Sequence, residues 1–227
     1  ATLTVDKQFD RLNKQIGVPD YANCAVVSSP FQYQRQVRFC VPGEAVEANN
    51  PDLHTSNLIE QIPEILSIKQ ANLVLFSSRK QMNDVFDALP SKWQDCILKQ
   101  DQTPKSQLLQ THQARIDQQQ GSTLFGLASF AEGVDLPGKY LTHLMIAKIP
   151  FVTPDDPVSA QLSEWVESQG GNAFMSITVP DAAIKLVQAC GRLIRTETDT
   201  GFIYLMDKRI NSKRYGAVLL NSLPNFG

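Results

Sequence analysis

The stretch TLFGLASFAEGVDLPGKY, residues 123–140, decides how this chain is expected to fold. Residues 123–127 are an apolar run short enough to be a buried strand of a parallel sheet. A polar loop punctuated by glycine follows at once. Gly133 permits a positive φ or a close approach of the backbone to a ligand. Asp135 can accept hydrogen bonds from a ribose hydroxyl or an arginine. The stretch therefore predicts a ligand-facing loop at the end of a buried strand.

Strand-like and helix-like segments alternate on both sides of this stretch. The sequence predicts strands at residues 72–76, 96–98, 123–127, 143–147 and 201–206. It predicts helices at residues 56–70, 81–89, 103–121, 158–168 and 181–195, although Pro63 weakens the first of them. Alternating β and α units of this length predict an α/β fold, a parallel sheet with helices on both faces. Ligands of such sheets bind at the carboxyl ends of the strands, and we expect the site there.

A second stretch, KLVQACGRLIRTETDTG at residues 185–201, has the spacing Q-x-x-G-R-x-x-R. On a continuous helix, Gln188, Arg192 and Arg195 share one face. Two guanidiniums on one face are costly to bury without an anion, and their planar donor geometry matches phosphate oxygens. The structural alternative is an amphipathic helix with a solvated pair of arginines.

The second stretch resembles the last motif of the superfamily 2 helicases, in which arginine fingers reach the γ-phosphate of ATP. SFAEGVDLPG, residues 129–138, resembles motif V of the narrower DinG/XPD-like branch. NLVLFSSRKQM, residues 72–82, resembles motif IV, a buried strand that ends in a Ser-Ser turn. The resemblance implies a RecA-like second motor domain of an ATP-dependent DNA helicase that moves in the 5′ to 3′ direction.

The resemblance also implies roles for individual residues. The catalytic set is Arg192 and Arg195 as arginine fingers, with Gln188 orienting the phosphate or the attacking water. The nucleotide-binding set is Glu132, Gly133, Asp135 and Gly191. The set for single-stranded DNA is Ser77, Ser78, Arg79, Ser129 and Phe130, although packing in the core is an equal alternative for Phe130.

Residues 133–140 come close to the phosphate-binding pattern G-x-x-x-x-G-K-[ST]. Tyr140 replaces the small hydroxyl that coordinates magnesium, and Pro137 removes a backbone N–H that such a loop needs. The following residues, 141–147, read as a strand, whereas a P-loop leads into a helix. The segment is therefore not expected to be a P-loop.

By the resemblance, ATP with Mg²⁺ is expected to be bound mainly by a first motor domain outside this chain. That domain usually holds an iron–sulfur cluster, and no cluster is expected in this chain because its cysteines lack clustered spacing. Residues 1–22 would be the trailing element of the first domain and a crossing segment, and residues 23–227 the second RecA-like domain. The expected partners are single-stranded DNA and the first motor domain, with no membrane.

The composition fits one ordinary soluble domain of 227 residues, or one domain with a small appendage. The net charge of −2 argues against a protein that nucleic acid wraps through bulk charge. Between Lys185 and Arg214, however, seven basic residues face three acidic ones. Cys24, Cys40, Cys96 and Cys190 are predicted to be buried free thiols, and the three histidines are assigned no metal. The sequence predicts neither a signal peptide nor a membrane span, so we expect a cytoplasmic protein.

Two other classes of protein remain open at this stage. One is a RecA-like interaction module that binds nucleic acid or protein without using ATP. The other is a complete α/β enzyme whose paired arginines bind a phosphorylated substrate.

Overall fold

The computed structural model describes residues 4–6, 8–9, 12–13, 16–19, 21–27, 29–151 and 157–227. The chain separates into two compact units. The described residues of one unit come from Ala1–Ser29, Ile149–Gln188 and Ile210–Pro224. The other unit consists of Pro30–Lys148, Ala189–Arg209 and Asn225–Gly227, and it contains the whole sheet.

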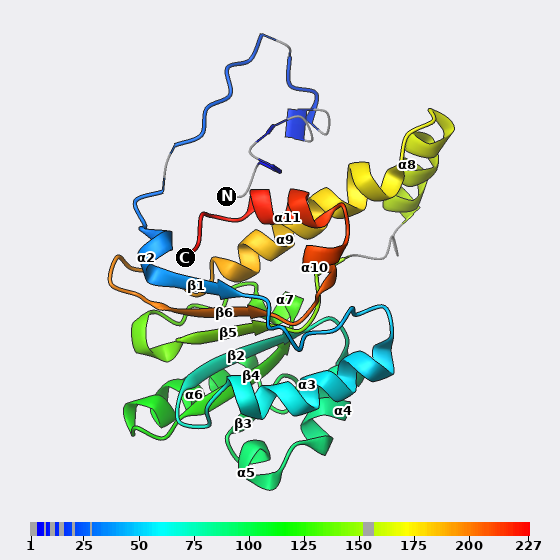
Figure 1. The fold of residues 1–227 in the computed structure, drawn as a ribbon. Coiled ribbons are helices and arrows are strands. Elements are labelled where there is room, and N and C mark those ends of the chain that lie inside the picture. Colours follow the sequence, from blue (N-terminus) through cyan, green and yellow to red (C-terminus); the bar gives the residue numbers. More distant parts are fainter. Residues whose placement is uncertain are drawn as a thin grey trace. The chain divides into compact units, whose positions relative to one another are not determined.

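The sheet has six strands in the order β1-β6-β5-β2-β4-β3, and all neighbours are parallel (Figure 1). The strands are β1 (Val37–Cys40), β2 (Ala71–Phe76), β3 (Ile97–Lys99), β4 (Ser122–Leu127), β5 (His143–Ile146) and β6 (Gly201–Leu205). All residues of β2 are buried, as expected of a central strand covered on both faces. The parallel sheet of an α/β fold, predicted from the sequence, is confirmed.

The helices of the sheet unit cover this sheet. They are α2 (Tyr33–Gln36), α3 (Pro51–Ile65), α4 (Arg79–Ala88), α5 (Ser91–Gln94), α6 (Lys105–Asp117), α7 (Ala128–Ala131) and the 3₁₀ turn η1 (Gly138–Tyr140). Leu58 and Ile62 of α3 pack with Val85 of α4 against Val74 and Phe125 of the sheet. Helices α3 and α4 lie side by side in Figure 1.

The second unit consists mainly of helices. It contains α8 (Pro157–Ser168), a π-helix (Phe174–Thr178), most of α9 (Val179–Cys190), most of α10 (Arg209–Ser212) and α11 (Gly216–Ser222). Phe151, Phe174 and Tyr215 form an aromatic cluster with ring centroids 5.3–5.5 Å apart. Across the described ranges, none of the helices is both long and apolar enough to cross a membrane.

The five predicted strands are confirmed to within one residue at either end. Strand β1 was not predicted, because it is a four-residue edge strand in which Arg38 and Cys40 are exposed. The helix predicted for residues 56–70 begins earlier, at Pro51, because Asn50 caps it by accepting a hydrogen bond from the backbone N–H of Leu53 (3.1 Å).

The prediction for the end of α9 and the prediction for the cysteines are wrong. The helix predicted to reach Arg195 ends at Cys190, so both motif arginines lie beyond it. The cysteines are also not all buried, because Cys24 and Cys40 are exposed. Cys190 is buried, and this burial raises the pKa of its thiol to about 12.

Candidate functional site

The two motif arginines meet on one backbone carbonyl of the motif V loop. Arg192 Nη1 donates to the carbonyl oxygen of Val134 (3.3 Å), and Arg195 Nη2 donates to the same oxygen (3.2 Å). Arg195 Nε also lies 3.3 Å from Asp135 Oδ1. The arginines therefore converge, as the spacing suggested, but they do so through a shared acceptor and not through a shared helix face.

The segment that holds the arginines is fixed by Asp199. This buried carboxylate accepts hydrogen bonds from the backbone N–H groups of Arg195 (2.7 Å) and Thr196 (2.9 Å) and from the Thr196 hydroxyl. Burial alone would raise the pKa of Asp199, but these hydrogen bonds outweigh burial and hold the pKa below its ordinary value. Gln36, the last residue of α2, also holds this segment, because its Nε2 donates to the backbone carbonyl oxygen of Asp199 (2.9 Å). Sequence reasoning missed both residues, although Thr196-x-x-Asp199 has the spacing of a capping box, in which the later side chain accepts from the backbone N–H of the first residue.

Arg192 and Arg195 lie on the connection between α9 and β6, and the carbonyl that they share lies on the connection between β4 and β5. The segment after α9 leads into the amino end of β6. Val134 lies on the connection that returns from the carboxyl end of β4 to the amino end of β5. The two segments therefore meet on the part of the chain that follows the carboxyl end of β4.

Lys105 is a third cation at this loop, and sequence reasoning did not identify it. It is the first residue of α6, and its ammonium group donates to the carbonyl oxygens of Phe130 (2.7 Å) and Glu132. The same group lies 5.0 Å from the centroid of the Phe130 ring. Lys105 thus ties α6 to the backbone of the motif V loop. We call Lys105, Arg192 and Arg195 the cation cluster.

The members of the cation cluster lower one another's pKa through the repulsion between their positive charges. Burial lowers the pKa of Lys105, and the positive charge of Arg192 lowers it further. Burial likewise lowers the pKa of Arg192, with a further lowering from Arg195 and an opposing effect from the carboxylates of Glu132 and Asp135. An anion placed against these three cations would relieve their repulsion, so the cluster suits a phosphate group.

The predicted nucleotide-binding residues Glu132, Gly133, Asp135 and Gly191 are exposed and belong to the sheet unit, as the cation cluster does. Gly133 has a φ of +72°, a conformation that favours glycine, and Glu132 beside it is exposed. Asp135 is also exposed, while its neighbour Val134 is buried. Gly191 is exposed in the turn that follows α9. Gln188, which was predicted to act with the two arginines in catalysis, is exposed on α9 and belongs to the helical unit.

The segment that resembles a P-loop has a different structure. Residues 138–140 form η1, which leads into β5 and not into a helix. Lys139 and Tyr140 are both bound to Asp117, with Lys139 Nζ 2.5 Å and the Tyr140 hydroxyl 3.0 Å from Asp117 Oδ1. The sequence prediction that this segment is no P-loop is confirmed.

Motif IV and motif V residues come together around Asp101. Arg79 Nε lies 3.1 Å from Asp101 Oδ2, and Asp101 lines a small pocket of about 210 Å³ together with Ser129 and Lys105. Ser77 is exposed at the end of β2. Ser78 is exposed as well, and its hydroxyl caps α4 by accepting a hydrogen bond from the backbone N–H of Gln81 (3.2 Å). These four candidate DNA contacts are all exposed.

Phe130 differs from the other DNA candidates because it is only 4% exposed. Its ring packs on Gly126, where an added Cβ would lie 2.6 Å from a ring carbon. Its side chain is therefore part of the core, and the interpretation of Phe130 as a stacking platform for DNA bases is wrong in this structure.

The histidines act as structural hydrogen-bonding groups. His112 is bound to the Ser122 hydroxyl (2.9 Å) and the carbonyl oxygen of Tyr140 (2.8 Å), and His54 is bound to the carbonyl oxygen of Met206 (2.9 Å). In the part of the chain that the structure describes, no three histidine, cysteine or acidic side chains are grouped so that they could hold a metal ion.

The parallel six-stranded sheet, the loop after β4 and the convergent arginines define a RecA-like motor domain of the helicase type. The sequence matches the family described as "Helicase C-terminal domain" over residues 62–226. The chain belongs to this family.

Curated relatives cover the whole of this chain. It is 43% identical to the ATP-dependent DNA helicase DinG of Photobacterium profundum, over 100% of this chain and 33% of the relative. It is 35% identical to the ATP-dependent DNA helicase YoaA of Haemophilus influenzae, over 99% of this chain and 34% of the relative. The chain thus spans about a third of the length of these relatives.

Solved structures support the fold. The chain is similar to an apo XPD structure with a TM-score of 0.60 and 19% identity, over 87% of this chain and 40% of that one. It is also similar to the S. tokodaii Xpd4 structure with a TM-score of 0.54 and 20% identity, over 84% of this chain and 37% of that one. At these identities the likeness concerns the fold alone.

Proposed function

We propose that this chain is the second motor domain of an ATP-dependent DNA helicase of the DinG/XPD type. In this proposal residues 23–227 form that domain, and residues 1–22 form the trailing element of a first motor domain in the same polypeptide. That first domain would bind most of the ATP with its Mg²⁺ and could hold an iron–sulfur cluster. The observation that carries the proposal is the convergence of Arg192 and Arg195 on the carbonyl oxygen of Val134.

The cation cluster suits the phosphate end of ATP, which would supply the phosphoryl group that is transferred to water. Arg192 and Arg195 would stabilise the negative charge that develops on this group, which is the largest contribution a protein makes to phosphoryl transfer. Gln188 would orient the phosphate or the attacking water. Glu132, Gly133, Asp135 and Gly191 would line the nucleotide side of the domain.

Single-stranded DNA would lie over the exposed residues around Asp101. Ser77, Ser78 and Ser129 offer hydroxyl groups and Arg79 a cation to the phosphate backbone, contacts that position a strand without reading its sequence. Lys105 lines the pocket beside Ser129 and also binds the carbonyl oxygen of Glu132. It would therefore connect the DNA side of the loop with the nucleotide side. Movement in the 5′ to 3′ direction is part of the proposal by resemblance.

The test replaces each arginine in the protein in which this chain is joined to a P-loop domain. Arg192→Ala or Arg195→Ala should reduce DNA-stimulated ATP turnover on the order of 10³-fold, with much less effect on nucleotide affinity. Arg→Lys at either position should restore little activity, because an ammonium group cannot reproduce the planar donor geometry. Folding of each variant is checked by its melting temperature.

The proposal fails if either alanine variant stays folded and keeps near-normal DNA-stimulated turnover. That result would favour an interaction module that does not use ATP. The chain of 227 residues by itself is expected to hydrolyse ATP no faster than background, because no segment of its sequence matches a P-loop.

A further inference from the structure

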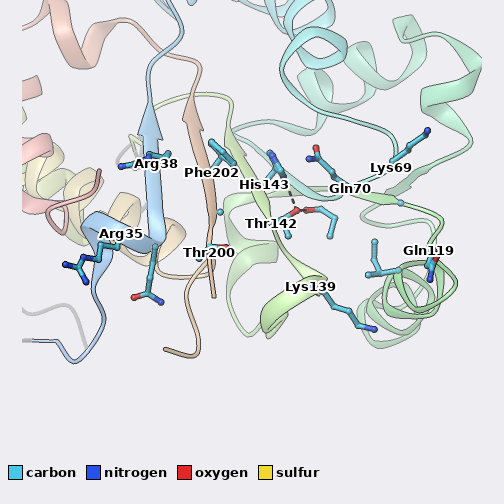
Figure 2. Close-up of a pocket in the computed structure, with 15 residues that line it drawn as sticks. Arg35, Arg38, Lys69, Gln70, Gln119, Lys139, Thr142, His143, Thr200 and Phe202 are labelled. Carbon is cyan, nitrogen blue, oxygen red and sulfur yellow. Dashed lines mark hydrogen bonds between the residues drawn. The ribbon is translucent and has the colours of Figure 1, made fainter. Parts of the chain in front are cut away.

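A pocket of about 560 Å³ lies at the amino ends of the strands (Figure 2). Several of the residues that line it stand directly before a strand. Gln36 precedes β1, Gln70 precedes β2, Thr142 precedes β5 and Thr200 precedes β6. We call this pocket the amino-edge groove. It shares no residue with the cation cluster or with the pocket beside Ser129.

The amino-edge groove is positively charged. Arg35, Arg38, Lys69 and Lys139 line it, and none of its lining residues is acidic within the part of the chain that the structure describes. Asp117, which does not line the groove, pairs with Lys139 and offsets its charge. Arg35, Arg38 and Lys69 then contribute three positive charges to the groove. His143 adds no charge at neutral pH, because burial lowers the pKa of its imidazole. In a chain with a net charge of −2, this is a local concentration of positive charge.

The cations of the groove do not converge on one point. Figure 2 shows Arg35 and Arg38 on one side of the pocket and Lys69 and Lys139 on the other. Thr142, His143 and Phe202 lie between the two pairs. A single phosphate is held by donors that point at one place, whereas cations at opposite ends suit a ligand with several phosphates along its length.

The groove also has an exposed aromatic side chain. Phe202 is 41% exposed, although its ring stacks on His143 at a centroid distance of 5.1 Å. In the register of the sheet, Phe202 stands beside Arg38 of β1. Exposed aromatic side chains among cations are typical of surfaces that bind single-stranded nucleic acid, because unpaired bases offer faces for stacking.

We propose that the amino-edge groove binds a single strand of nucleic acid, with the two pairs of cations contacting its phosphates and Phe202 contacting a base. Double-stranded nucleic acid fits less well, because its bases are already stacked and cannot reach Phe202. The inference does not rest on the proposed function, since it concerns different residues.

The test measures binding of a fluorescent oligo-dT to the 227-residue chain by anisotropy. In Arg38→Glu/Lys69→Glu, affinity should fall by roughly tenfold or more, and the dependence of log affinity on log salt should become shallower by about 0.7 per lost phosphate contact. Phe202→Ala should weaken binding roughly fivefold or more without changing the salt dependence. The matched control Lys92→Glu/Lys185→Glu has the same change of charge outside the groove and should bind nearly normally.

Footprinting of lysines by acetylation locates the oligonucleotide, because Lys69 and Lys139 are exposed. Oligo-dT should protect both lysines and leave Lys92 reactive. The proposal is overturned if the groove variant binds like the control, or if Lys69 and Lys139 stay reactive when oligo-dT is bound elsewhere. It is also overturned if duplex DNA or polyglutamate protects these lysines as well as oligo-dT does, since the groove would then recognise charge alone. Equal melting temperatures among the variants exclude loss of folding as the cause.

Discussion

The cation cluster and the amino-edge groove are both positively charged, but they hold their charges differently. In the cluster, Lys105, Arg192 and Arg195 are bound to backbone carbonyls of one short loop, between residues 130 and 134. In the groove, the cations are exposed and lie on opposite sides of the pocket. Fixed, converging donors suit one phosphoryl group whose charge changes during a reaction. Separated, exposed donors suit a long polyanion that is held without chemistry.

The aromatic residues of the two regions differ in the same way. Phe130 beside the cluster is 4% exposed, and Phe202 in the groove is 41% exposed. The buried ring supports the loop from inside, while the exposed ring is available to a ligand. Position in the fold therefore separates two phenylalanines whose chemistry is identical.

The largest expected effect is on ATP turnover, which should depend on the cation cluster and not on the groove. In the protein that joins this chain to a P-loop domain, Arg195→Ala should lower ATP turnover at saturating DNA on the order of 10³-fold. Arg38→Glu/Lys69→Glu should leave turnover at saturating DNA within about twofold, because both residues line the groove and neither belongs to the cation cluster. Steady-state ATPase assays over a range of DNA concentrations measure both. A large loss of saturated turnover in the groove variant would contradict the separation.

The next effect concerns the stability of the fold. Phe130→Ala should lower the free energy of unfolding by about 3 kcal/mol, because it leaves a cavity in the core. Phe202→Ala should lower it by less than about 1 kcal/mol, because much of that ring is already in water. Urea denaturation of both variants followed by circular dichroism makes the measurement. Equal losses in the two variants would remove the distinction between supporting and ligand-facing rings.

Lys105 gives a smaller effect within the cation cluster. Lys105→Ala should lower ATP turnover in the joined protein by roughly tenfold with little change in the KM for ATP, because the loop loses the donor that holds its carbonyls. Lys105→Arg should recover part of the turnover, since a guanidinium also donates to carbonyl oxygens. A purely structural role predicts something else, namely a lower melting temperature with full turnover per folded molecule.

The smallest expected effect is on how the free energy of unfolding depends on pH. The groove contains a buried histidine, His143, whereas the cation cluster consists of Lys105, Arg192 and Arg195. Burial lowers the pKa of His143, so the unfolded chain binds more protons than the folded one below about pH 6.5. The free energy of unfolding should therefore fall as the pH is lowered from about 7.5 to 5.5, by at most about 1.4 kcal/mol from this residue. His143→Gln should make the fall smaller, while His54 and His112 keep their contributions. Urea denaturation at the two pH values measures the loss of unfolding free energy in both proteins. An equal loss in His143→Gln and in the unchanged chain would refute the contribution of His143.

The end of α9 illustrates what a local pattern could not predict. The apolar spacing continues through Leu193 and Ile194, both buried, and it favoured a helix to Arg195. The helix stops at Cys190, next to Gly191, a residue with low helix propensity. Asp199 then accepts hydrogen bonds from the backbone N–H groups of Arg195 and Thr196, which replace the helical partners. The competing acceptor lies beyond the helical pattern, so periodicity gave no sign of it.

The sequence by itself determined the parallel α/β architecture and the order of the motifs, because apolar runs and their breaks are local properties of the chain. It also identified Arg192 and Arg195 as a pair that suits phosphate. Only the tertiary structure decided that both meet the Val134 carbonyl, since the partners are 58 and 61 residues apart. The same holds for the contact of Lys105 with the loop, the burial of Phe130 and the amino-edge groove, because exposure and hydrogen-bond partners depend on segments that only folding brings together.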